Sequence, residues 1–200
     1  MTEETWLLLD RYGIVLGDSM LTLSVLAAII GFFRRNDLKR WLRRNSFGRI
    51  GTPTPPDLEL DALLLPVSKA DIPNWIIDTQ RPRYLALIAT PQSLDAARQI
   101  EEHAYRQGAV SVTIATLMDT DDAKACRDLA TSLLRQLQDA GAQRLGADTT
   151  GGKVPMSLGV FMAAEEAGVA TLYVSADYDD ALKRPKLDTA RLILISTPVA

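Results

Sequence analysis

The sequence contains one cysteine and one histidine among its 200 residues. A single cysteine, Cys126, cannot form an internal disulfide, so the chain fits a reducing compartment and we expect a buried thiol. His103 has no cysteine or histidine partner at metal-ligand spacing, and it follows Glu101 and Glu102 in a polar helical stretch. A histidine-based zinc site or a Ser-His-Asp triad would need His103, which we expect instead to be solvated.

Positive charge is scarce in most of the chain. From Asn45 onward there are 15 basic and 20 acidic residues, whereas residues 34–44 hold six basic residues against the single Asp37. Non-specific affinity for nucleic acid comes from neutralising phosphates, so an acidic domain is a poor binder of DNA or RNA polymers. We therefore expect no direct nucleic-acid polymer among the partners.

Two common nucleotide-binding motifs are also missing. No GxGxxG follows the first predicted strand, which argues against a dinucleotide dehydrogenase. The stretch that begins at Gly146 approaches the P-loop pattern GxxxxGK[ST], but Val154 follows Lys153 where that motif needs a magnesium-binding hydroxyl. From the missing metal, triad, dehydrogenase and P-loop patterns we predict that the chain has no metal site, no cofactor and no catalytic residues.

One long apolar run is present. Residues 14–33 carry a single charge, Asp18, and a 20-residue helix spans about 30 Å, the thickness of a bilayer core. A buried core helix and a signal peptide are the alternatives. Acidic Glu3 and Glu4 precede the run and arginines follow it, the reverse of a signal peptide. Residues 1–33 are therefore predicted to hold one N-terminal transmembrane helix.

The basic cluster that follows the run predicts its orientation. Under the positive-inside rule, residues 34–200 lie in the cytoplasm and the N-terminus lies outside, as in a single-pass protein of a bacterial inner membrane. Residues 34–44 read as an amphipathic helix at the lipid headgroups. Residues 46–57 are rich in Gly, Pro and Thr, so the range 34–57 is a basic juxtamembrane helix and a linker.

A carboxylate within a membrane span usually faces a bundle interior or a water path. Asp18 and the residues on the same face of the helix would line a pore in a symmetric oligomer, with a carboxylate ring above an apolar constriction. The predicted pore-lining residues are Asp18, Thr22, Leu26, Ile29 and Phe33. Alternatively, Asp18 lies at the headgroups and ends the span early. Gly13 and Gly17 form a GxxxG pair, which indicates either self-association or chance.

Beyond the linker, residues 58–200 alternate strand-like and helix-like segments, which predicts an α/β domain with a Rossmann-like parallel sheet and flanking helices. Buried strands are predicted at 62–67, 84–89, 110–115, 143–147, 170–174 and 191–196. Helices are predicted at 93–107, 122–140 and 155–167. Gly108, Gly141 and Gly168 follow the helices, where left-handed C-cap residues are expected.

Ligands of open α/β sheets bind beyond the carboxyl ends of the strands. Three loops there offer hydroxyls, backbone N–H groups and two lysines, namely 66–69, 90–93 and 148–153. This chemistry suits a phosphate or a nucleotide. A purely structural turn is the other explanation for Gly151 and Gly152.

The segment 148–159, DTTGGKVPMSLG, resembles the hallmark D-x-T-G-G-T-K-x-M-[ST] of CARF domains, the CRISPR-associated Rossmann folds. Lys153 stands where that family usually has threonine, and Val154 stands where it usually has lysine. The resemblance implies dimers that bind cyclic tetra-adenylate or cyclic hexa-adenylate. The ligand contacts that it implies are Ser68, Lys69, Thr90, Thr150, Gly151, Gly152, Lys153 and Met156. As members of the same loops, Pro91, Gln92 and Thr149 are also predicted to bind the ligand.

With its N-terminal span, the chain looks like the membrane channel proteins of type III CRISPR systems. The resemblance implies a cyclic-oligoadenylate-gated channel that depolarises an infected cell, built as a homo-oligomer in the bilayer. Because two helices cannot enclose a pore, CARF dimers would assemble into a tetramer or larger. Two alternatives are a membrane-tethered ring nuclease, acting through Ser68, Thr90 and Lys153, and a sensor whose span is only an anchor.

Overall fold

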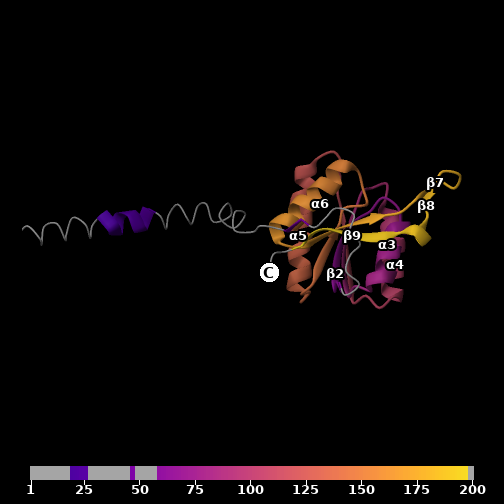
Figure 1. Ribbon diagram of the computed structural model, residues 1–200, viewed down its shortest axis with the longest axis horizontal. Coiled ribbons are helices and arrows are strands. Elements are labelled where there is room, and N and C mark those ends of the chain that lie inside the picture. The colour runs from indigo at the N-terminus through magenta and orange to yellow at the C-terminus, as the bar shows by residue number, and fades with distance from the viewer. Residues whose placement is uncertain (1–18, 27–45, 48–57, 198–200) are drawn as a thin grey trace, which may run out of the picture. The chain divides into compact units, whose positions relative to one another are not determined.

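The computed structural model describes residues 19–26, 46–47 and 58–197, and the chain divides into two compact units, Met1–Arg44 and Asn45–Ala200 (Figure 1). In the first unit, residues 19–26 are helical and exposed. Within the described ranges, no helix has the length and apolarity needed to cross a bilayer. Of the predicted pore-lining residues, Thr22 and Leu26 lie on this helix, while Asp18, Ile29 and Phe33 lie outside the described residues.

The second unit alternates strands and helices, as the sequence predicts. Its strands are β1 (Ser46–Phe47), β2 (Ala62–Pro66), β3 (Tyr84–Ala89), β4 (Ser111–Thr116), β5 (Leu145–Asp148), β6 (Ala170–Ser175), β7 (Tyr178–Asp179), β8 (Arg184–Pro185) and β9 (Arg191–Thr197). Its helices are α3 (Asp71–Gln80), α4 (Leu94–Arg106), α5 (Ala123–Asp139) and α6 (Val154–Ala167), with a 3-10 turn, η1 (Leu187–Thr189).

These elements build a seven-stranded sheet in the order β1-β9-β6-β5-β2-β3-β4. The five strands from β6 to β4 are parallel, which confirms the Rossmann-like expectation for the centre of the sheet. The prediction of a parallel sheet is wrong at one side. There β9 runs antiparallel to β6, and β1 runs antiparallel to β9. Residues 46–47, which we predicted as linker, thus belong to the sheet.

Helices cover both faces of the sheet (Figure 1). The residues of β2 alternate between two cores: Ala62 and Leu64 pack with α5 and α6, whereas Leu63 and Leu65 pack with α3 and α4. All four side chains are 0% exposed. A strand buried on both sides reads as a continuous apolar run, which is why β2 was visible in the sequence.

Glycines end the helices as predicted. Gly108, Gly141 and Gly168 have φ angles of 96°, 96° and 65°. These left-handed conformations cost a glycine little, because it has no Cβ.

Candidate functional site

Three loops meet at one edge of the sheet because the strands before them are parallel neighbours. β2 lies between β5 and β3, and all three strands end at this edge. The chain runs from β2 to β3 and β4 on one side, and then returns to β5 on the other side of β2. Such a reversal of strand order opens the crevice in which α/β proteins bind ligands.

The glycine loop, residues 149–153, packs against the end of β2. A Cβ built on Gly151 would lie 2.0 Å from the backbone oxygen of Pro66, a distance that no side chain tolerates. Gly152 has a φ of 80°, and a Cβ there would meet the Met156 side chain at 3.1 Å. The two glycines therefore let the backbone of this loop lie directly on its neighbours.

The buried Asp148, at the end of β5, holds the same loop through a hydrogen bond. Its side chain is 1% exposed, its Oδ1 accepts a hydrogen bond of 2.5 Å from the Thr150 hydroxyl, and its Oδ2 has no partner within the described residues. Burial raises the pKa of Asp148 to about 6, although the Thr150 hydrogen bond opposes the shift. The carboxyl group is thus poised to change its charge just below neutral pH.

The two threonines of the loop point inward. The Thr150 hydroxyl also accepts the Val174 N–H at 2.7 Å, and the Thr149 hydroxyl donates to the Leu172 oxygen at 2.9 Å. Both contacts fasten the loop to β6. Thr149 and Thr150 were predicted to contact ligand, and in this structure their hydroxyls hold the loop in place.

Thr90 and Ser93 form a closed pair in the loop after β3. The Thr90 N–H donates to the Ser93 hydroxyl at 2.9 Å, and the Ser93 N–H donates to the Thr90 hydroxyl at 3.2 Å. Both residues are buried, whereas Pro91 and Gln92 are exposed at the tip. We did not select Ser93 from the sequence, although a hydroxyl three residues after Thr90 at a helix start is a capping pattern.

Two exposed basic groups of this edge are Lys69 and Lys153. Lys69 and its neighbour Ser68 are exposed after β2. Lys153 precedes α6, and its ammonium lies 3.3 Å from Asp121, with 60% of the side chain exposed. An ion pair this exposed contributes little to stability. Lys153 can therefore exchange Asp121 for a phosphate group at low cost.

Met156, the remaining predicted contact, lies beneath the loop. Its side chain is 1% exposed, and its backbone oxygen accepts a hydrogen bond from the Cys126 thiol at 3.3 Å. In this conformation Met156 supports the glycine loop from the core. Cys126 is buried as predicted, and burial raises the pKa of its thiol to about 11.

His103 differs from the prediction. Its side chain is 18% exposed rather than solvated, and its Nε2 lies 2.7 Å from Asp78 of α3. The pair joins α4 to α3. Among the described residues, no group of three metal-ligating side chains comes together.

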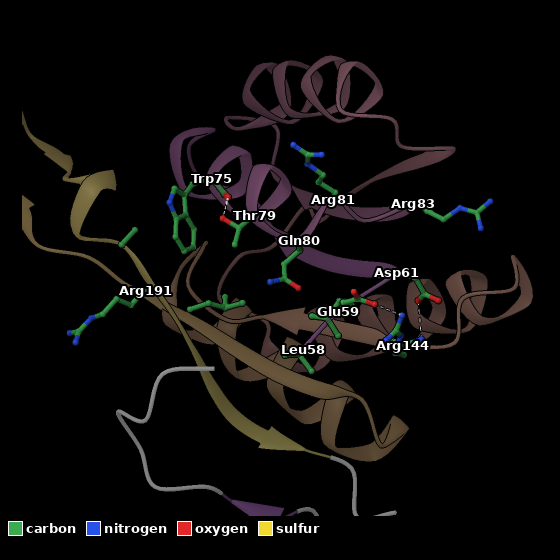
Figure 2. Close-up of a pocket in the computed structure, with 13 residues that line it drawn as sticks. Leu58, Glu59, Asp61, Trp75, Thr79, Gln80, Arg81, Arg83, Arg144 and Arg191 are labelled. Carbon is green, nitrogen blue, oxygen red and sulfur yellow. Dashed lines mark hydrogen bonds and ion pairs between the residues drawn. The ribbon is translucent and has the colours of Figure 1, made fainter. Parts of the chain in front are cut away.

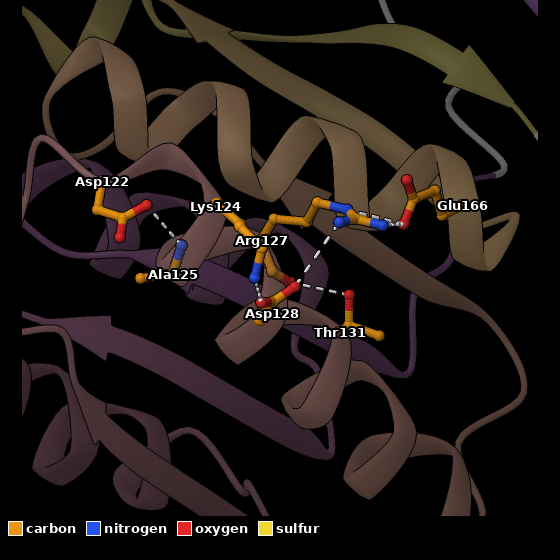
Figure 3. Close-up of polar contacts among 7 residues, drawn as sticks. All are labelled: Asp122, Lys124, Ala125, Arg127, Asp128, Thr131 and Glu166. Atoms are coloured by element: carbon orange, nitrogen blue, oxygen red, sulfur yellow. Dashed lines mark hydrogen bonds and ion pairs between the residues drawn. The ribbon is translucent and has the colours of Figure 1, made fainter.

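An arginine–glutamate pair joins α5 to α6 (Figure 3). The Arg127 guanidinium donates to Glu166 from Nε at 2.9 Å and from Nη2 at 2.6 Å. The Asp122 carboxylate caps α5 by accepting the Ala125 N–H at 2.9 Å. Gly159 allows the close approach, since a Cβ there would lie 2.7 Å from the Ala123 oxygen.

A groove of about 730 Å³ lies elsewhere in the domain, between α3 and the start of β9 (Figure 2). None of the predicted ligand contacts lines it. Figure 2 shows Gln80 directed into the groove, while the guanidinium groups of Arg81, Arg83 and Arg191 point in different directions. Because these guanidinium groups do not converge, they do not form an anion-binding site. We therefore take the three loops, and not this groove, as the candidate ligand site.

No family model and no curated protein matches the sequence. Several solved structures, in contrast, match the fold of this chain. Can2 from Sulfobacillus thermosulfidooxidans, in complex with cyclic tetra-adenylate, is 15% identical and aligns over 63% of this chain and 36% of its own, with a TM-score of 0.50. This similarity shows a shared fold. It agrees with the Rossmann-like sheet that the CARF resemblance implies.

Two further structures match with TM-scores below 0.5 and add nothing to that conclusion. A type III CRISPR defence DNA nuclease activated by cyclic oligoadenylate is 22% identical over 67% of this chain and 21% of its own, with a TM-score of 0.48. Enterococcus italicus Csm6, bound to cyclic hexa-2′-fluoro-hexa-dAMP, is 13% identical over 65% and 37%, with a TM-score of 0.49. The chain thus spans 21% to 37% of the length of these three proteins.

Proposed function

We propose that residues 58–197 bind a cyclic oligoadenylate at the loop cluster. The observation that carries this proposal is the glycine loop packed on the end of β2, at the point where the strand order reverses. Lys69 and Lys153 are exposed there, and backbone N–H groups at the start of α6 add positive potential. Phosphodiesters are anions, so these groups match the backbone of the ligand. The shared fold with Can2, solved with cyclic tetra-adenylate, supports the same ligand class.

The output that we propose is ion flow through a membrane pore. The apolar run 14–33 is the part of this chain best suited to act as an effector, and Asp18 is its single charge. Ligand binding would shift the population of open and closed assemblies only by its differential affinity for the two. The result would be depolarisation of an infected cell, as a type III CRISPR effector at the inner membrane.

The geometry favours a sensor over a ring nuclease. Ribose cleavage needs groups that are free to move or stabilise charge. The Thr90 hydroxyl, one of the candidate groups, is buried and engaged with Ser93. The single histidine, His103, is paired with Asp78. We therefore propose a protein that binds its ligand without a catalytic centre.

Calorimetric titration of the detergent-solubilised full chain with cyclic tetra-adenylate and cyclic hexa-adenylate tests the ligand. We expect saturable binding of at least one ring. Lys69→Ala and Lys153→Ala should each weaken binding about tenfold, because each removes one charge-assisted contact. Arg106→Ala removes a positive charge at the end of α4, on the opposite edge of the sheet, and should leave affinity unchanged. Absence of binding for both rings would overturn the proposed ligand class.

A further inference from the structure

Strand β4 is an open edge of the sheet. Within the described residues, no strand pairs with the side of β4 that faces away from β3. An edge strand carries a row of unpaired N–H and C=O groups, and proteins normally protect it with charges, proline or a covering element. The sequence of β4 is SVTIAT, which contains no charged residue and no proline. This edge is therefore suited to pairing with another strand.

The hydrogen bonds to β3 indicate which residues of β4 direct their backbone groups outward. The N–H of Leu117, just after the strand, donates to the Ala89 oxygen at 2.7 Å, so the backbone groups at odd-numbered positions of β4 point toward β3. Val112 and Ile114 therefore point their N–H and C=O groups away from β3. Their side chains pack against the core beneath α3 and α4 but are only partly buried.

Helix α4 extends the same edge. His103 pairs with Asp78 of α3, so the opposite side of α4 faces away from α3 and toward the open edge. At 3.6 residues per turn, four residues lie on that side, spaced four, three and four apart. They are Leu94, Arg98, Glu101 and Tyr105. The Tyr105 side chain is 48% exposed, although it is large and aromatic.

We propose that β4 and α4 pair with the same two elements of a second copy of the chain, about a two-fold axis perpendicular to the sheet at Thr113. The two β4 strands then run antiparallel and join two sheets into one. Val112 of each copy faces Ile114 of the other, and cross-strand pairs of β-branched residues stabilise a sheet. The contact closes on itself, so neither open edge is left exposed.

The order of charges on α4 selects a second copy as the occupant. Six strand residues and thirteen helical residues both span about 20 Å, so Thr113 lies level with the middle of α4. The axis at Thr113 therefore sets the two α4 helices antiparallel, with Arg98 of each copy opposite Glu101 of the other. An unrelated strand would satisfy the backbone of β4 but would leave these side chains unmatched.

The contact is made along the outer side of β4 and α4 and needs no ligand. It is therefore a second surface, separate from the glycine loop. Its consequence for assembly rests on the proposed function: two chains that share a ligand could be joined to two more through β4. Four chains satisfy the requirement that more than two helices enclose a pore.

Disulfide cross-linking of the full chain in detergent, without ligand and with copper phenanthroline as the oxidant, tests the pairing. Facing residues of a non-hydrogen-bonded antiparallel pair have Cα atoms about 4.5 Å apart, within the range of a disulfide. Thr113→Cys should give at least fivefold more dimer than the control Tyr173→Cys, which is 43% exposed on β6 inside the sheet. Wild type supplies the background, because Cys126 is buried.

The register gives a second readout. Ser111→Cys chains alone should stay at the control level, whereas a mixture of Ser111→Cys and Ala115→Cys chains should form dimers, because these two positions face each other. Thr113→Cys at the level of Tyr173→Cys would overturn the pairing. Dimer formation by Ser111→Cys alone, equal to that of Thr113→Cys, would indicate non-specific association and would overturn it too.

Charge reversal on α4 tests the choice of occupant. In the Thr113→Cys chain, Arg98→Glu places like charges opposite each other twice and should lower the yield of dimer at least threefold. Adding Glu101→Arg restores opposite charges and should restore the yield. An equal loss in the single and the double reversal would contradict a second copy at α4. Because no ligand is present, these results do not depend on whether the loop cluster binds cyclic oligoadenylate.

Discussion

Asp148 is a buried carboxyl group at the base of the loop that we assign to the ligand. Its ordinary pKa of 3.8 is raised to about 6 by burial. The folded protein therefore holds a proton that the unfolded chain has already released, and unfolding becomes easier as the pH rises from about 4 to about 6. At neutral pH the ionised group lowers the free energy of unfolding by about 3 kcal/mol relative to acid.

Asp148→Asn should remove this pH dependence. The amide oxygen can still accept the Thr150 hydroxyl, but the residue no longer ionises. We expect the variant to gain about 2 kcal/mol of stability relative to wild type between pH 4.5 and pH 7.5, measured by urea unfolding at both values. Asp139→Asn, at an exposed position, is the control and should follow wild type. An unchanged pH dependence would show that Asp148 titrates normally.

The side chains of this site could be chosen from the sequence, but their orientations could not. Lys69 and Lys153 were selected as contacts and are exposed at the expected edge. The hydroxyls of Thr149 and Thr150 turn toward β6, because the N–H of Val174 and the carbonyl of Leu172 need partners there. Such partners come from strand pairing far along the chain, which a local pattern does not reveal.

The glycine loop is the element whose backbone geometry matters most. Gly151→Ala should displace the loop from the end of β2, because its Cβ would lie 2.0 Å from the Pro66 oxygen. We expect a lower melting temperature and at least a tenfold loss of affinity for cyclic tetra-adenylate. Gly108→Ala is the matched control. It has a φ of 96° but open space around it, so it should cost about 1 kcal/mol of stability and no affinity.

Equal effects of the two substitutions on affinity would contradict a role for close packing in the loop. In that event the close approach of Gly151 to Pro66 would not control ligand binding.

Because α5 and α6 pack closely, replacing Gly159 with alanine should change stability in the opposite direction to the usual effect in a helix. Replacing a helical glycine with alanine commonly stabilises a helix by about 1 kcal/mol. At Gly159 the added Cβ would lie 2.7 Å from the Ala123 oxygen and 2.8 Å from Cys126 Cβ. Gly159→Ala should therefore lower the melting temperature, as measured by circular dichroism of the solubilised chain. A rise in melting temperature would show that α5 and α6 separate easily.

Apolar periodicity located the central strands within one or two residues, because β2 and β3 are buried on both faces. It missed α3, where Pro73 in the first turn and a short ten-residue length obscure the helical pattern. It also assigned β9 to a parallel sheet. The direction of a buried strand leaves no mark on its composition, although the absence of a long helix between β6 and β9 already favours an antiparallel return.

At the scale of the whole molecule, the channel and anchor hypotheses differ in what the apolar run 14–33 must do. A channel needs the chemistry of the residues that line it, whereas an anchor needs only an apolar helix. Thr22 and Leu26 lie one turn apart on the helical residues 19–26, and Asp18 precedes them by one further turn in the sequence. The two hypotheses therefore predict different results for substitutions that keep the span apolar.

Ion flux from proteoliposomes, measured with an encapsulated potassium-sensitive dye, distinguishes them. We expect cyclic-oligoadenylate-dependent flux from wild type, and at least a tenfold decrease when Asp18→Ala and Thr22→Leu are combined, because the carboxylate that attracts cations is lost. Ligand affinity should be unchanged, since Lys69 and Lys153 are intact. Flux equal to wild type would remove the proposed pore-lining face. Binding without flux in the wild type would favour the anchor, with the antiviral output supplied by a recruited partner.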